Sequence, residues 1–103
     1  MKRVVAYVPD LMDRSKVAAG SASVRFVRSP AELVTVAVDA DLVLVDLARP
    51  GVLDVLASIG APTVGFASHV DRELIAAARV AGCGEVLTRS AFFSRLPRLL
   101  DAE

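Results

Sequence analysis

The stretch DLVLVDLARPG, residues 41–51, decides the fold of this chain. It runs from a Val- and Leu-rich segment into the carboxylate of Asp46, and Pro50 follows four residues later. An apolar run of this length is typical of a strand that is buried on both faces of a parallel sheet. Asp46 would then lie at the carboxyl end of the strand, where α/β sheets place binding and catalytic groups.

Other segments with the length and composition of strands lie on both sides of this stretch, and the last of them is the weakest. They are residues 3–8, 23–27, 62–67 and 85–89. Segments with helical spacing or with caps separate them, and this alternation predicts a parallel sheet wrapped by helices. We expect a three-layer α/β/α sandwich in the α/β class, with a five-stranded sheet of order 2-1-3-4-5.

The predicted helices differ in strength. Residues 68–82 show the clearest apolar face, with Ser68 and Asp71 as N-terminal signals and Gly82 as the stop. Ser29 and Pro30 predict the start of another helix. The helices after the first and third strands are short, and Pro97 is expected to end or kink the last one, unless a new turn begins there.

Composition narrows the function classes. The 103 residues predict a single domain over 1–103, and 12 basic residues balance 12 acidic ones. Without a net charge we expect no nucleic-acid partner. The apolar start is too short for a signal peptide and no stretch is long enough to span a membrane, so the sequence predicts a cytoplasmic protein without a membrane partner.

The single cysteine and the single histidine carry little chemical signal. Cys83 lies in AGCGE, which indicates a small side chain filling a tight turn, with a reactive thiol as the weaker alternative. His69 lies in a loop, where a solvated or capping role is the commoner reading. Neither residue has a partner at a spacing typical of a nucleophilic triad or of a cysteine-based metal site.

The stretch around Asp46 resembles the third strand of receiver domains, the phosphoaccepting domains of two-component response regulators. Asp46 matches the phosphoacceptor of that family, and Pro50 matches the proline that follows it. The similarity continues through APTVGFASHVDRELIAAARVAGCGEVLTRSAF, residues 61–92, and covers most of the chain. The resemblance implies a flavodoxin-like receiver fold with shortened helices, and a role in two-component signalling or in a phosphorelay.

The chain departs from the receiver pattern at most of the positions that surround the phosphoacceptor. Receivers carry two acidic residues after the first strand to hold Mg²⁺, and here only Asp10 of that pair is present. Ala67 stands where a Ser or Thr hydroxyl is usual, with Ser68 one residue later. Arg89 replaces the usual Lys, and Val86 replaces the aromatic switch residue.

The resemblance therefore implies a reduced phosphate site. Asp46 would accept the phosphoryl group, Asp10 and Asp46 would hold Mg²⁺, and Arg89 and Ser68 would contact the phosphate. The loss of one transition-state donor at Ala67 costs on the order of 3 kcal/mol. The alternatives are structural: Asp46 caps the following turn or pairs with Arg49 or Arg89, and Asp10 is a helix N-cap.

Two functions follow from these readings. The first is a stand-alone signalling or adaptor domain, not an enzyme, that binds a histidine kinase or a downstream effector and is modulated by phosphorylation at Asp46. The second is a pseudo-receiver that serves only for interaction or dimerisation, in which no phosphate is used.

Receivers commonly pair through the fourth helix, fifth strand and fifth helix. Here Phe92 and Phe93 would lie on that surface, either with one exposed or with both packed under the sheet edge.

Overall fold

The computed structural model describes residues 2–20 and 23–101, and strands alternate with helices along this part of the chain. The strands are β1 Val4–Tyr7, β2 Val24–Phe26, β3 Leu42–Asp46, β4 Thr63–Ala67 and β5 Glu85–Thr88. The helices are α1 Leu11–Gly20, α2 Pro30–Val36, α3 Val52–Val55, α4 Arg72–Val80 and α5 Arg89–Leu99. Short 3₁₀ helices, Ala37–Asp39 and Leu56–Ser58, follow α2 and α3.

The described strands form one parallel sheet in the order β2-β1-β3-β4-β5, which confirms the predicted topology. In β3, Val43 to Val45 have no exposed surface, so this strand is buried on both faces as the opening stretch predicts. Because all strands are parallel, their carboxyl ends meet at one edge of the sheet, and the loops after β1, β3 and β4 gather there with the start of α5.

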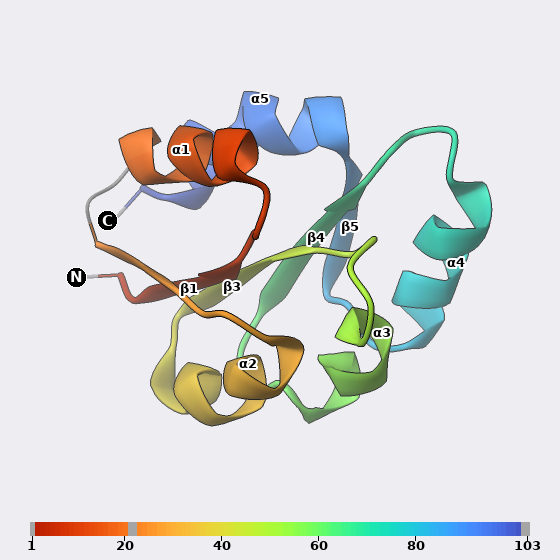
Figure 1. The fold of residues 1–103 in the computed structure, drawn as a ribbon, viewed down its shortest axis with the longest axis horizontal. Coiled ribbons are helices and arrows are strands. Elements are labelled where there is room, and N and C mark those ends of the chain that lie inside the picture. Colours follow the sequence, from red (N-terminus) through yellow and green to blue (C-terminus); the bar gives the residue numbers. More distant parts are fainter. Residues whose placement is uncertain (1, 21–22, 102–103) are drawn as a thin grey trace.

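Helices cover both faces of the sheet, as Figure 1 shows. Helices α1 and α5 lie together on one face, and α2, α3 and α4 cover the other. Successive strand side chains point to opposite faces. In β1, Val4 and Ala6 pack in the same apolar cluster as Val17 of α1, whereas Val5 and Tyr7 pack in the cluster that contains Leu33 of α2.

Local signals account for most helix boundaries. The Ser29 hydroxyl accepts a hydrogen bond from the Glu32 N–H at 3.3 Å and Pro30 opens α2, as predicted. Gly82 ends α4 with φ at 104°, a conformation that favours glycine. The start of α4 was predicted too early, because Ser68 caps a separate turn by accepting from the Val70 N–H at 3.4 Å.

The last helix does not end at Pro97, which corrects one of the two effects expected of this residue. Helix α5 begins at Arg89, where the Thr88 hydroxyl accepts from the Ala91 N–H, and it continues past Pro97 to Leu99. Phe92 is fully buried and Phe93 is partly buried, and their ring centroids lie 4.5 and 5.5 Å from that of Phe66. Both phenylalanines therefore pack against the sheet, which is the second of the two expected arrangements.

Candidate functional site

Asp46 is the last residue of β3, and its carboxylate is engaged in the turn that follows. Its side chain is 10% exposed. One oxygen, Oδ1, accepts a hydrogen bond from the Ala48 N–H at 3.1 Å, and the other, Oδ2, accepts from Arg49 Nε at 3.2 Å. Gly51 then takes φ at 85° and immediately precedes α3. Asp46 thus caps the following turn and pairs with Arg49, as the structural alternative predicts, and its role as a phosphoacceptor stays a prediction.

Arg89 is paired with a carboxylate that the sequence analysis did not single out. Its Nη2 donates to Oδ1 of Asp13, which lies on the first turn of α1. The Asp13 side chain is 3% exposed and that of Arg89 is 45% exposed. This hydrogen bond is the main cause that raises the pKa of the Arg89 guanidinium above its ordinary value, and the negative charges of Asp46 and Asp10 act in the same direction.

Asp13 had a signal in the sequence that could have revealed it. Asp13 and Val17 are four positions apart and so share one face of α1, and Val17 has no exposed surface. An aspartate on the apolar face of a helix is rarely buried without a partner. This pattern would have predicted a buried cationic partner for Asp13, although it would not have identified Arg89 as that partner.

Asp10 caps α1, as the structural alternative predicted. Its Oδ1 accepts hydrogen bonds from the N–H groups of Met12 and Asp13, each at 3.0 Å. The bond from the Asp13 N–H is the main cause that holds the pKa of the Asp10 carboxyl below its ordinary value, and the positive charges of Arg49 and Arg89 add to it. Both hydrogen bonds of this cap end on Oδ1, so the other oxygen of the exposed carboxylate, Oδ2, takes no part in the cap.

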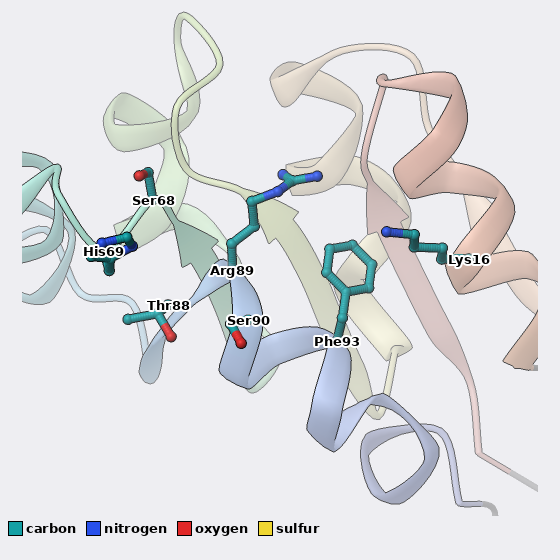
Figure 2. Close-up of a pocket in the computed structure, with 7 residues that line it drawn as sticks. All are labelled: Lys16, Ser68, His69, Thr88, Arg89, Ser90 and Phe93. Atoms are coloured by element: carbon teal, nitrogen blue, oxygen red, sulfur yellow. The ribbon is translucent and has the colours of Figure 1, made fainter.

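Ser68 and Arg89 come together at one pocket, shown in Figure 2, whereas Asp10 and Asp46 do not line it. The pocket has a volume of about 670 Å³ and includes His69. Ala67 is buried and its methyl group cannot donate a hydrogen bond. The Ser68 oxygen accepts a hydrogen bond from the Val70 N–H of the loop, and within the described ranges the hydroxyl makes no hydrogen bond to Asp46, so its role as a replacement donor stays a prediction.

The predicted Mg²⁺ ligands, Asp10 and Asp46, both have structural partners in this arrangement. Mg²⁺ takes near-octahedral oxygen coordination, and carboxylates that bind it must face a common point. Here Asp46 is bonded to Arg49 and Asp13 to Arg89, so guanidinium groups already balance both buried charges. In the described ranges, no three acidic, histidine or cysteine side chains gather in a metal-binding group. The magnesium site remains a prediction without support from this geometry.

Cys83 fills space in the apolar interior. Cys83 is buried, and burial is the main cause that raises the pKa of its thiol, which favours the unreactive protonated form. Its Sγ lies 3.3 Å from the carbonyl oxygen of Glu85, in keeping with the filler role expected from the sequence.

Across residues 2–20 and 23–101, no helix combines the length and the apolar character needed to cross a membrane.

The sheet order and the carboxylate after the third strand define a flavodoxin-like α/β fold of the receiver type. No family model matches the sequence, and no curated protein matches it. Solved structures do match. A response regulator from Hahella chejuensis superposes with a TM-score of 0.77 at 19% identity, covering 93% of this chain and 89% of that one.

Two further structures have the same architecture. A response regulator receiver domain from Rhodospirillum rubrum matches with a TM-score of 0.72 at 17% identity, covering 94% of this chain and 89% of that one. The phosphorylated cyanobacterial phytochrome response regulator RcpA matches with a TM-score of 0.68 at 20% identity, covering 94% and 86%. At these identities the likeness establishes the receiver fold, and the activity has to be argued from the site.

Proposed function

We propose that this chain is a receiver-fold signalling module that acts by binding another protein and does not use phosphoryl transfer to Asp46. The observation that carries this proposal is the Asp46 carboxylate itself, because each of its oxygens already has a partner within the turn. An attacking carboxylate oxygen must be free to approach the phosphorus atom in line with the leaving group. Each oxygen keeps a second lone pair, but the Arg49 guanidinium lies against Oδ2 and the side chain is only 10% exposed, so the approach of a phosphodonor is hindered.

The groups that would assist the transfer are also engaged or missing. Arg89, the candidate phosphate contact, is bonded to Asp13, and Ala67 offers no hydroxyl. Phosphoryl transfer depends almost entirely on positioning and on cations that stabilise the developing charge. The proposal therefore gives the chain no enzymatic role and no need for Mg²⁺. Pairing of two copies through α4, β5 and α5 remains a prediction, to be checked by light scattering of the purified protein.

A second candidate function is phosphorylation-dependent signalling at Asp46. It is favoured by the placement of Asp46, Asp10 and Arg89 at the carboxyl edge, where the two carboxylates act electrostatically on the guanidinium. Under this alternative, a phosphodonor would have to separate Asp46 from Arg49. The two functions make opposite predictions for one measurement.

The test is intact-mass analysis after incubation with acetyl phosphate and Mg²⁺. We expect no phosphoryl mass increment on the native chain, and circular dichroism should confirm that the protein is folded. Arg49→Ala, which frees Oδ2 of Asp46, and Asp46→Asn, which removes the acceptor, are the matched variants. An increment on the native chain that disappears in Asp46→Asn would overturn the proposal and establish phosphorylation at Asp46.

A further inference from the structure

The pocket in Figure 2 has a charge pattern that the proposed function does not explain. It lies between the loop after β4, the start of α5 and helix α1, and its charged lining groups are Lys16 and Arg89, with no carboxylate among its walls. Arg89 is balanced by the buried Asp13, whereas Lys16 is exposed and takes part in none of the ion pairs found in the described ranges. Lys16 therefore brings to the pocket a positive charge that no ion pair in the described part of the chain balances. Arg89, by contrast, also lies in the field of Asp46 and Asp10.

Both cations lie close to the same aromatic ring. The Nζ atom of Lys16 is 5.0 Å from the centroid of the Phe93 ring, and Cζ of Arg89 is 5.5 Å from the same centroid. Cation–π contacts at these distances hold the two side chains over a partly buried apolar floor. Arg89 uses Nη2 for Asp13, and the rest of its fork-shaped guanidinium can donate to a second acceptor.

The pocket continues into an apolar groove between α1 and α5. A second hollow of about 410 Å³ shares Lys16 and Phe93 with the pocket, and Ala19, Leu96 and Pro97 also line it. Ligand pockets for small molecules typically measure about 300–1,000 Å³, so each hollow alone would suffice for one small anion. A cationic end joined to an apolar groove suits a longer occupant that carries both kinds of group.

We propose that this pocket and groove bind a protein partner through a segment that combines acidic and apolar side chains. A Glu or Asp carboxylate of the partner is held between Lys16 and Arg89, and a neighbouring apolar side chain packs on Phe93 and along Leu96 and Pro97. Charge complementarity identifies the occupant, since the lining offers cations, hydroxyls and apolar surface but no acid. The inference rests on the proposed function and specifies the chemistry of the partner.

The experiment uses a short fluorescein-labelled peptide of alternating glutamate and leucine, titrated with the full chain and followed by fluorescence anisotropy. We expect saturable binding that weakens about tenfold in Lys16→Glu, which corresponds to about 1.4 kcal/mol. Arg79→Glu is the matched control, because Arg79 is an exposed cation on α4 that does not line either hollow. It should bind as the native chain does.

Two further arms keep the result decisive. A peptide with glutamine in place of glutamate should bind about tenfold more weakly, and Lys16→Ala should fall between the native chain and the charge reversal. Absence of saturable binding, equal binding of the glutamine peptide, or equal loss in Arg79→Glu would overturn this inference. These outcomes leave the proposed function intact, because that proposal fails only on the phosphoryl mass increment at Asp46.

Discussion

Asp13 is the most buried charged side chain among the described residues, and it is balanced by a guanidinium that is almost half exposed. The two partners of this pair are therefore not equivalent. Water can hydrate Arg89 when Asp13 is lost, whereas the Asp13 carboxylate, only 3% exposed, loses its one charged partner among the described residues when Arg89 is lost. Removing one partner of a buried pair costs most when the charge left behind is the buried one.

We expect Arg89→Ala to lower the free energy of unfolding by about 3 kcal/mol and Asp13→Asn to lower it by about 1–2 kcal/mol. Urea denaturation of each variant measures both values. The double variant should lose less than the sum, because the stranded carboxylate of Asp13 is then absent. Arg95→Ala is the control, since its ion pair with Glu85 is exposed and should contribute about 0–1 kcal/mol. Additive losses would contradict the coupling.

Helix α5 contains a proline at an exposed position near its C-terminus. Proline cannot donate the backbone hydrogen bond that the Phe93 carbonyl would otherwise accept, and its ring crowds the preceding turn. The helix nevertheless continues to Leu99, because Leu96 and Leu100 are buried in the apolar cluster that also holds Val17 of α1. Burial of these side chains outweighs the local preference of Pro97.

Pro97→Ala is accordingly expected to stabilise the protein. Proline is about 3 kcal/mol less favourable than alanine inside a helix, and the greater freedom of the unfolded chain returns about 1 kcal/mol of that difference. Near a helix end we expect a net gain of about 1–2 kcal/mol, seen as a higher Tm by circular dichroism. Ser94→Ala, at another exposed position of α5, should gain at most about 0.5 kcal/mol. An unchanged or lower Tm in Pro97→Ala would contradict this account.

The whole molecule is organised around a central strand and a weak edge. Strand β3 pairs with β1 on one side and β4 on the other, and all of its residues are buried. Strand β2 has three residues, pairs only with β1 and is partly exposed throughout. Regions with few buried apolar contacts open at a lower free energy than the central strands do.

Native-state amide hydrogen exchange should show this gradient. We expect the slowest exchange at Val43, Leu44 and Val45, whose amides open only when the whole domain unfolds. Exchange in β2 should be faster by at least about tenfold, which corresponds to a local opening free energy lower by about 1.4 kcal/mol. Equal protection in the two strands would indicate that the edge and the centre unfold together.

The sequence by itself determined the fold, because its signals for the fold are local. Apolar runs, the Ser29–Pro30 start and the Gly82 stop mark the elements, and their alternation predicts the observed sheet order. The sequence also placed Asp10, Asp46, Ser68 and Arg89 at one edge, because each of them lies at the carboxyl end of a predicted strand or within two residues after it. The sequence could not decide, for each of these residues, between a role in a phosphate or Mg²⁺ site and a purely structural role.

Only the tertiary structure decided how the charges at that edge are paired. Asp13 and Arg89 are 76 positions apart, and they meet because α1 and α5 pack side by side on the same face of the sheet. Arg49 rather than Arg89 pairs with Asp46, and the continuous α5 places Phe93 beside Lys16. The physical reason is that the strength of a charge contact depends on distance and burial in three dimensions, and neither quantity can be read from spacing along the chain.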